Sequence, residues 1–406
     1  MTKSFYKKTK SSFIFHFSPF HLPLYSAKLE KHLHIITLNV PYPVDYGGVF
    51  DLFYNLPALQ QQGVQIHLHC FDYGRGQQDE LNKYCASVQY YERLSGHKAV
   101  STTIPYIVAS RKNEQLFQDL LKDDYPIFME GVHCTYLLND ERFKNRRKFV
   151  RVHNVEYQYY HDLFKSAPSP LKKIYYGRES KLLKQYEHSI ASKATAFWGV
   201  THKDVDTYRT EFDCKTIDYL SLYLPPTWQV NCPIGKGHYC LYQADLSVEV
   251  NEKAALWLLK KVFSIIEVPF VIAGKNPSKK LEELAHQHLH TCIVANPGEK
   301  EMQDMIAKAH INILPSYHNS GIKLKLLNAL YNGRHCLVND ATVIGSGLED
   351  LCTVANTEDE IIKNILQLEH QVFSQAHVDK RKKVLLNMFN NEANAKQQVK
   401  WIWGEA

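Results

Sequence analysis

The 406-residue sequence predicts an α/β protein built of two doubly wound domains that face each other across a cleft. Apolar runs of strand length alternate with segments of helical periodicity from Leu33 onward. The chain is too long for one ordinary core and suits two domains of roughly 150 to 200 residues each. A proline-rich stretch without periodicity at 224–233 separates two such alternating sets, so we place a linker at 226–233.

The first domain is predicted at 31–225, after an N-terminal extension at 1–30 that we expect to be poorly ordered. Its helices are predicted at four places: at 49–62, which Gly63 ends, in the tyrosine-rich stretch that starts at about 156, at 171–190, and after Thr201. Its strands are predicted at the apolar runs 34–40, 64–71, 127–130, 148–152 and 194–198.

The second domain is predicted at 234–390, and residues 391–406 are expected to form a C-terminal helix that packs back on the first domain. Ligands bind doubly wound sheets at the carboxyl ends of the strands, so the residues that follow strands are the candidates for function. The predicted strands are 238–243, 269–273, 291–295, 311–314 and 336–338, and the predicted helices are 249–263, 278–288, 300–309 and one that begins at Gly321.

The composition excludes several classes of protein. A hydrophobic content of 45% with 22% charged residues is that of a globular protein. The net charge of +6, without zinc-ligand spacing or a basic repeat, argues against nucleic-acid binding. The nine cysteines, an odd number without paired spacing, indicate reduced thiols in a cytosolic protein.

The sequence also bears on membranes and export. No stretch reaches the ~18 consecutive apolar residues of a membrane span. The basic and then apolar stretch at 7–24 mimics a signal peptide, but two histidines and two prolines interrupt it. We therefore favour an N-terminal extension over an export signal.

An anion site is predicted where the strand at 311–314 leads into the helix that begins at Gly321. A helix N-terminus offers unpaired N–H groups and the positive end of the helix dipole, and a glycine there lets the backbone approach a phosphate. Lys323 and Lys325 add two positive charges in the same turn, which suits a diphosphate. A surface lysine pair on an ordinary helix is the alternative interpretation.

The stretch from Pro315-Ser316 through Gly321 to Gly333 resembles the donor-nucleotide signature of retaining glycosyltransferases of the family 4 type. Looser similarities extend over most of 31–370, and the resemblance implies the GT-B architecture of two Rossmann-like domains. It further implies that the second domain binds a nucleotide-diphospho-sugar as donor substrate, that the first binds a glycan or lipid-linked acceptor, and that no cofactor is needed. The donor-binding residues implied in the second domain are Gly274, Lys275, Glu299, Ser320, Gly321, Ile322, Lys323, Lys325 and Asn328.

Two positions depart from the family pattern. Many relatives carry two glutamates separated by seven residues, one for the transferred sugar and one for the nucleotide ribose, and Ser320 and Asn328 stand there in this chain. Asn328 can hydrogen-bond a hydroxyl, but more weakly than a carboxylate does. A non-catalytic binding or partner subunit therefore stays open as an alternative. A nucleotide-sugar epimerase, which shares the architecture but needs acid and base groups, is a further alternative.

Three motifs of the first domain are candidates for contacts with substrates. Gly47-Gly48 forms a tight turn that lets the sugar or phosphate of a donor approach, or it merely joins a strand to a helix. His153 is suited to hydrogen-bond a sugar hydroxyl or a phosphate, as the resemblance also implies, and helix capping by His153 or Asn154 is the alternative. Glu130 is a weaker candidate for an acceptor-side carboxylate.

The catalytic candidates are therefore His153, Lys325 and Glu130. Departure of the leaving group builds negative charge on the diphosphate, and Lys323, Lys325, Lys275 and the helix N-terminus would stabilise it in place of a metal. Retaining transfer on the front face needs no strong general base.

Two patterns that suggest metal binding are interpreted otherwise. Asp204 and Asp206 fall on a predicted helix and are expected on its solvated face. Of the histidines at 286, 288 and 290, only the outer pair would share a helix face, so without a further ligand we expect no zinc site there and no metal elsewhere.

The segment 144–193 is basic, with twelve lysines and arginines against four acidic residues. Interleaved apolar residues make 171–190 a basic amphipathic helix. It could lie on an anionic membrane, on the inner leaflet, where a lipid-linked acceptor resides, or it could form an ordinary solvated face.

Overall fold

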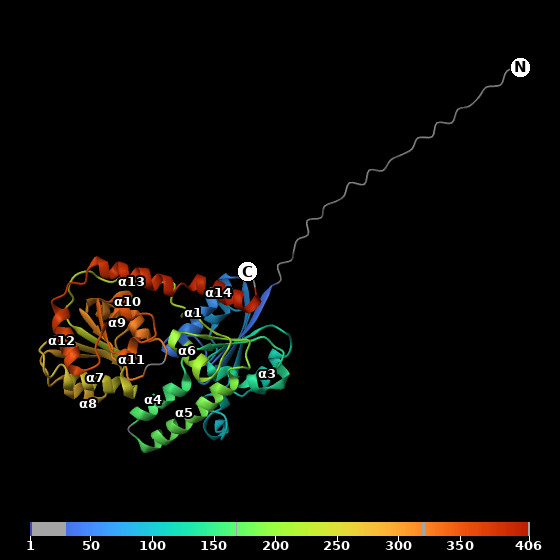
Figure 1. The fold of residues 1–406 in the computed structure, drawn as a ribbon, viewed down its shortest axis with the longest axis horizontal. Coiled ribbons are helices and arrows are strands. Elements are labelled where there is room, and N and C mark those ends of the chain that lie inside the picture. The colour runs from blue at the N-terminus through green and yellow to red at the C-terminus, as the bar shows by residue number, and fades with distance from the viewer. Residues whose placement is uncertain (2–29, 168, 319–320, 405–406) are drawn as a thin grey trace. The chain divides into compact units, whose positions relative to one another are not determined.

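The computed structural model describes residues 1, 30–167, 169–318 and 321–404. The extension expected at 1–30 thus falls outside the described residues, apart from its first and last positions. Residues from Lys31 onward contain two separate parallel sheets with helices packed around them (Figure 1). The predicted fold class, two Rossmann-like α/β domains, is confirmed.

The first sheet has seven strands in the order β3-β2-β1-β4-β5-β6-β7. Its strands are β1 Lys31–Thr37, β2 Val64–Asp72, β3 Ser87–Glu92, β4 Ile127–Glu130, β5 Lys148–Val152, β6 Ala196–Gly199 and β7 Ile217–Tyr219. The second sheet has six strands in the order β10-β9-β8-β11-β12-β13. Its strands are β8 Cys240–Asp245, β9 Phe270–Lys275, β10 Thr291–Ala295, β11 Ile311–Ile313, β12 His335–Val338 and β13 Thr353–Val354.

Helices connect these strands. In the first domain they are α1 Gly47–Gln61, α2 Tyr106–Ala109, α3 Glu114–Leu120, α4 Glu156–Ser166, α5 Pro170–Ile190 and α6 His202–Glu211. In the second they are α7 Glu249–Lys261, α8 Lys279–Ala285, α9 Glu299–Lys308, α10 Leu324–Asn332, α11 Asp340–Val343, α12 Glu358–Glu369 and α13 Gln375–Met388, followed by α14 Asn391–Trp403. Short 3-10 helices lie at Asp79–Lys83, Gly96–Ala99, Val132–Asn139, Glu141–Phe143 and Glu349–Leu351.

The strand order places a crevice at the same point of each sheet. β1 lies between β2 and β4, and β8 lies between β9 and β11, so the chain runs outward in both directions from these strands. Loops diverge at such switch points and leave room for a ligand. Glu130 at the end of β4 is in register with Thr37 of β1 and Arg151 of β5, so the predicted residues Glu130 and His153 come from neighbouring strand ends.

The predicted strands at 127–130, 148–152 and 291–295 agree with β4, β5 and β10 residue for residue. β3, β7 and β13, which the sequence analysis did not predict, lie at sheet edges. Strands buried on both faces are continuous apolar runs, whereas edge strands carry polar residues or are short. The helix expected after Thr201 is confirmed as α6, with the Thr201 hydroxyl accepting from the Asp204 N–H.

The C-terminal helix α14 packs against the first domain, although α13 before it belongs to the second (Figure 1). Ile402 is 1% exposed in the core formed around β1 and β2. The Trp401 ring stacks on Trp198 of β6 with centroids 5.5 Å apart, and the Tyr223 hydroxyl donates to Gln398 at 2.7 Å. α14 is therefore an integral part of the first domain.

The chain passes between the two domains twice, first after β7 and again between α13 and α14. The two crossings are tied together side by side. The Leu224 N–H donates to the Asn391 side chain at 2.9 Å, and Asn391 Nδ2 donates back to the Leu224 carbonyl at 2.7 Å.

All nine cysteines are free thiols. Among the described residues, no helix combines the length and the apolar character that a membrane span requires.

We predict that Ile402→Ala lowers the free energy of unfolding by about 2 to 4 kcal/mol, because it leaves a cavity in the core of the first domain. Urea unfolding of the full chain measures this change. Lys400→Ala on the exposed side of the same helix is the control and should cost less than about 0.5 kcal/mol. Equal, small effects of both substitutions would show that α14 does not contribute to that core.

Candidate functional site

A cleft with a volume of about 630 Å³ lies at the carboxyl ends of the first sheet and is closed by residues of the second domain. One lining residue follows each of the seven strands: Leu38, Tyr73, Arg93, His133, His153, Val200 and Leu222. The second domain contributes Asn251, His318, Ile322, Lys323, Leu324 and Lys325. Of the residues predicted from the sequence, the cleft thus brings together Gly47, Gly48, His153, Ile322, Lys323 and Lys325.

A buried ion pair fixes the first-domain wall. Arg151 is 0% exposed, and its Nε donates to Asp51 Oδ2 of α1 at 2.9 Å. Its two terminal nitrogens donate to the carbonyls of Leu220 and Ser221, each at 2.7 Å. Asp51 Oδ1 accepts from the Tyr223 N–H at 2.7 Å. These bonds hold α1, β5 and the segment after β7 in one fixed arrangement.

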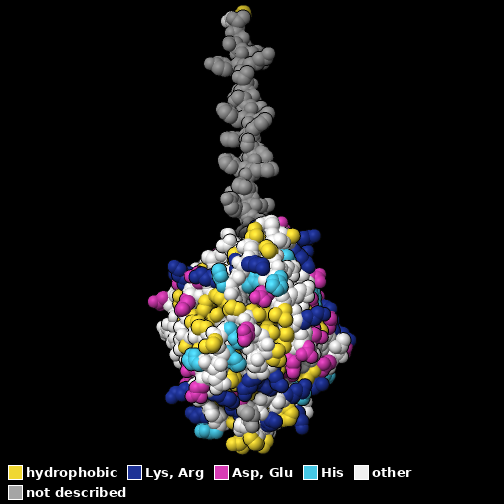
Figure 2. Space-filling view, turned by 90° about the vertical axis from the view of Figure 1, so that its left-hand side faces the viewer, with side chains coloured by type: hydrophobic (Ala, Val, Ile, Leu, Met, Phe, Trp, Pro, Cys, Tyr) yellow, Lys and Arg dark blue, Asp and Glu magenta, His cyan; other side chains and the backbone are white. Residues whose placement is uncertain are grey.

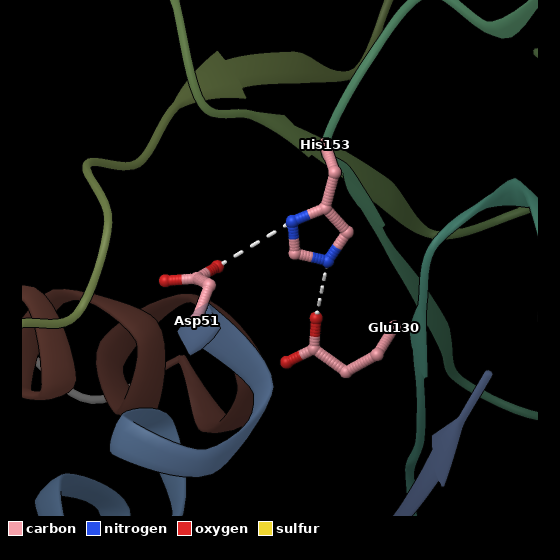
Figure 3. A group of neighbouring side chains, drawn as sticks. All are labelled: Asp51, Glu130 and His153. Carbon is pink, nitrogen blue, oxygen red and sulfur yellow. Dashed lines mark hydrogen bonds and ion pairs between the residues drawn. The ribbon is translucent and has the colours of Figure 1, made fainter. Parts of the chain in front are cut away.

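His153 lies at the edge of this network, next to Glu130 (Figure 3). Its Nε2 is 2.9 Å from Glu130 Oε2, and its Nδ1 is 3.7 Å from Asp51 Oδ2, which is too long for a hydrogen bond. Glu130 is 0% exposed and does not line the cleft, so it acts on a ligand only through His153. The Nδ1 atom of His153 is the ring nitrogen left for a ligand.

The ligand atoms of Asp51, Glu130 and His153 lie within 4.8 Å of one another, a grouping that could hold a metal ion. Their oxygens are already engaged: Asp51 Oδ2 accepts from Arg151, and Glu130 Oε1 accepts from Asn55 Nδ2 at 2.8 Å. The buried guanidinium of Arg151 would also repel a cation. The residues therefore fit a metal poorly, and the absence of a metal requirement stays a prediction.

Helix capping by His153 or Asn154 is not what the structure shows. The first residue before α4 is Val155, and no side chain of the capping residue bonds the helix. Instead the Glu187 carboxyl from α5 accepts the N–H groups of Glu156 and Tyr157 at 3.0 and 2.9 Å.

The helix predicted to begin at Gly321 begins at Leu324 instead. Gly321 has a φ of +62°, and an added Cβ would lie 2.3 Å from Asn154 Oδ1 and 2.6 Å from the His153 carbonyl. This glycine therefore allows close contact between the two domains. Ser320, the other residue predicted in this turn, lies outside the described residues.

The start of α10 still faces the cleft. No side chain caps this helix, and Leu324 and Lys325 of its first turn line the cleft. Across from it, Gly47 begins α1, where an added Cβ would lie 3.5 Å from Leu324 Cδ1. The two predicted helix starts, Gly47-Gly48 and the lysine turn, thus face each other.

The two lysines of this turn are partly withdrawn from water. Burial lowers the pKa of Lys323 to about 7, against the opposing effect of the Asp204 carboxylate, and burial lowers the pKa of Lys325 to about 8. Lys323 Nζ lies 3.1 Å from His318 Nδ1, and Lys325 Nζ lies over the Tyr242 ring at 5.3 Å. An anion in the cleft would raise both lysine pKa values toward the ordinary range, and the two charged lysines would then attract the anion.

The interpretation of Asp204 as part of a solvated face is wrong. Asp204 is 1% exposed and bonds the Thr201 hydroxyl at 2.6 Å, while Asp206 is exposed as predicted. The helical pattern correctly placed Asp204 on α6. It did not indicate that Lys323 of the second domain approaches this residue, where its charge lowers the pKa of the Asp204 carboxyl against the larger effect of burial.

The remaining predicted residues do not line the cleft. Gly274 is packed so tightly that an added Cβ would lie 1.8 Å from the Ala244 carbonyl, and Lys275 is exposed at the end of β9. Glu299 is exposed at the start of α9. The Asn328 side chain accepts from Asn332 Nδ2 at 2.9 Å within α10.

Sequence reasoning missed several residues of the site. Asp51 is a single carboxylate within an apolar helix, and Arg93 and Arg111 follow segments that were not assigned. The sequence analysis did not single out Glu156, yet it lines the cleft and is 4% exposed. Burial, together with the nearby Glu187, raises the pKa of Glu156 to about 8, so this carboxyl is neutral near pH 7. A charged residue in an apolar run is the one signal that could have indicated Asp51.

Comparisons of the sequence with known proteins identify a similar protein but no family. No family model matches the chain. A protein of Klebsiella pneumoniae, described as an uncharacterized 44.6 kDa protein in the cps region, is 24% identical over 377 residues, which cover 88% of this chain and 94% of its own length.

Solved structures show the fold more directly. TarM superposes with a TM-score of 0.66 at 11% identity, covering 92% of this chain and 99% of its own. The fold is GT-B. A glycosyltransferase from Rickettsia africae has a TM-score of 0.62 at 13% identity, covering 93% of this chain and 100% of its own. WaaG, a glycosyltransferase involved in lipopolysaccharide biosynthesis, has a TM-score of 0.61 at 12% identity, covering 92% and 100%.

We predict that Glu156 and Glu187 make a contribution to the free energy of unfolding that falls as the pH rises from 5 to 8. Burial raises the pKa of Glu156 to about 8 and that of Glu187 to about 7, so both keep a proton in the folded state that the unfolded chain has lost. Each group contributes a slope of up to about 1.4 kcal/mol per pH unit in this window.

Glu156→Gln removes one of the two groups, so between pH 5 and 8 the free energy of unfolding measured in urea should fall less, or rise more, with pH than it does in the wild type. Glu141→Gln, at a side chain that is 87% exposed, is the matched control and should leave the slope unchanged. An identical pH dependence in Glu156→Gln and the wild type would contradict this assignment.

Proposed function

We propose that the protein is a glycosyltransferase that moves a sugar from a nucleotide-diphospho-sugar to a glycan or lipid-linked acceptor, as in polysaccharide biosynthesis. The observation that carries the proposal is the cleft itself. Lys323, Lys325 and the uncapped start of α10 stand on one wall, and His153 with Glu130 stands on the other. The GT-B fold, shared with TarM and WaaG, supports the same reading.

The chemistry follows from where charge develops. As the glycosidic bond to the leaving diphosphate breaks, negative charge accumulates on the phosphate oxygens. Lys323 and Lys325 would stabilise that charge, and so would the N–H groups of the first turn of α10. This wall would supply the positive charge that a metal provides in other enzymes, so we propose a metal-independent transfer.

His153 would position the sugar rather than act as a strong base. Its Nε2 is held by Glu130, which leaves Nδ1 to accept a hydrogen bond from a sugar hydroxyl. The described lining residues do not offer a free carboxylate nucleophile, because Asp51 is bonded to Arg151 and burial raises the pKa of Glu156 to about 8. This arrangement supports transfer with retention on the front face of the sugar, as proposed from the sequence.

The decisive experiment incubates the purified full chain with a panel of nucleotide-diphospho-sugars and candidate acceptors, with and without EDTA. We expect one donor to release free nucleoside diphosphate, and the rate to be unchanged by EDTA. An epimeric sugar in place of free nucleotide would identify an epimerase. A thermal shift without turnover would identify a binding subunit.

Lys325→Ala tests, within the same experiment, whether the second-domain wall of the cleft binds the diphosphate of the donor. Loss of a charge-assisted contact should weaken nucleoside diphosphate binding by about 1.5 to 3 kcal/mol. Lys308→Ala, at an exposed lysine at the end of α9, should bind as the wild type does. Unchanged affinity in Lys325→Ala would place the donor elsewhere.

We also propose peripheral contact with an anionic membrane through α5, which would bring the cleft near a lipid-linked acceptor. Leu171 and Ile174 at the start of this helix are 79% and 70% exposed, and Lys172 and Lys173 are exposed beside them. Figure 2 shows hydrophobic side chains at the lower end of the molecule, where α4 and α5 lie in Figure 1, with lysines and arginines close by. Apolar side chains at the tip and cations around them suit an anionic bilayer surface.

We predict that the full chain co-sediments with vesicles that contain anionic lipid at low salt and dissociates at high salt, because each lysine near such a surface contributes about 1 kcal/mol. Replacing Lys172 and Lys173 by glutamate should abolish sedimentation. The same exchange at Lys382 and Lys383, two exposed lysines of α13, is the control. Equal sedimentation of both double variants would exclude α5 as the membrane contact.

A further inference from the structure

Two arginines meet in the first-domain part of the cleft. Arg93 Nε donates to Ser110 Oγ at 3.1 Å, and an Arg111 terminal nitrogen lies 3.5 Å from the same oxygen. Arg111 is 3% exposed and also donates to the carbonyls of Leu38 and Ile107. One hydroxyl thus joins two guanidinium groups.

Neither guanidinium has a carboxylate within 4.0 Å among the described residues. Arg93 lies over the rings of Tyr73 and Tyr106, at 4.6 and 5.7 Å, which position the group but carry no net charge. Burying like charges together without a partner is costly, and two arginines this close repel each other. Burial, and the nearby charge of Arg93, lower the pKa of Arg111 to about 10.

The carboxyls of the cleft do not form ion pairs with these arginines. Among the described lining residues, the only carboxyls are Asp51, which is paired with Arg151, and Glu156, whose pKa burial raises to about 8 against the opposing effect of the Arg111 charge. Ser110 and Arg111 are neighbours in the chain, whereas Arg93 reaches Ser110 from 17 positions away, so the pair of arginines does not follow from local sequence.

His133 connects the arginines to His153. It lines the cleft, its Nδ1 is buried without a hydrogen-bond partner, and its pKa is held well below the ordinary value by burial and by Arg111, His153 and Arg93. His133 therefore lies within electrostatic reach of both the arginine pair and His153. The lysine turn of α10 belongs to the opposite, second-domain wall.

We propose that Arg93 and Arg111, with His133, bind an anionic group of the acceptor, a carboxylate or a phosphate, while the acceptor hydroxyl lies toward His153. This inference rests on the proposed function and names the class of acceptor. Among the described residues, Arg93 makes a hydrogen bond only through Nε, so both terminal nitrogens can make a planar, bidentate contact, which suits either oxyanion. Arg111 lies at the bottom of the subsite, where its hydrogen bonds to the carbonyls of Leu38 and Ile107 fix its position.

The test compares three probes that differ only at one position: methyl glucoside, methyl glucuronoside and methyl glucoside 6-phosphate. Ligand-observed NMR on the full chain measures their affinity, and UDP affinity is measured in parallel. We expect at least one anionic glycoside to bind about 10-fold or more tightly than methyl glucoside, and Arg93→Ala to remove this difference. The tighter of the two anionic probes identifies carboxylate or phosphate.

Arg93→Lys keeps a positive charge and should retain part of the preference for anionic glycosides. Such partial retention would show that the loss in Arg93→Ala comes from the missing charge and not from a folding defect. Arg142→Ala, at an exposed arginine paired with Glu114 and Asp140, is the control and should bind as the wild type does. Equal binding of all three glycosides, or binding of none, would overturn the subsite.

The UDP arm separates this proposal from the donor site. Unchanged UDP binding in Arg93→Ala, with loss of the anionic glycoside, supports an acceptor subsite. Loss of UDP binding in Arg93→Ala would show that the arginines hold the donor instead. If the wild type binds no nucleotide but still prefers the anionic glycosides, the proposed donor fails while the anion subsite stands.

Discussion

The salt bridge between Arg151 and Asp51 is the interaction on which the first-domain wall of the cleft depends. Through four hydrogen bonds it joins a strand end, the helix that begins at Gly47, and the segment that leads out of the domain. One bond links Arg151 to Asp51, and the other three link these two side chains to the backbone at 220–223. Removing one partner would leave a buried charge uncompensated, a change that costs several kcal/mol in comparable pairs. His153 and Gly47 take their positions from this pair.

The two walls of the cleft differ in the way they carry positive charge. On the second-domain wall, Lys323 and Lys325 have lowered pKa values, so their charge depends on pH and on what is bound. On the first-domain wall, Arg93 and Arg111 keep their charge throughout the physiological range. A leaving group that gains charge during reaction suits the first kind of site, and a substrate group with a permanent charge suits the second.

The sequence predicted the elements that bring Glu130 and His153 together, because strands buried on both faces are uninterrupted apolar runs. It did not predict that Glu130 is hidden behind His153, or that Asp204 is buried, because both depend on packing between distant segments. Arg151 and Asp51 are 100 positions apart, and no local pattern links them. The start of α10 was placed three residues early because glycine and lysine are equally compatible with a helix start and with the loop before it.

The paired crossings at Leu224 and Asn391 also limit how the cleft can change. A single connection would let one domain swing freely about the other. Two connections that are hydrogen-bonded side by side act together as one hinge. The second of them is fixed to the first domain, because α14, which follows it, packs into the core of that domain. Any opening of the cleft would therefore pivot about this edge, so that the mouth opposite it moves farthest while the spacing of residues near the crossings changes least.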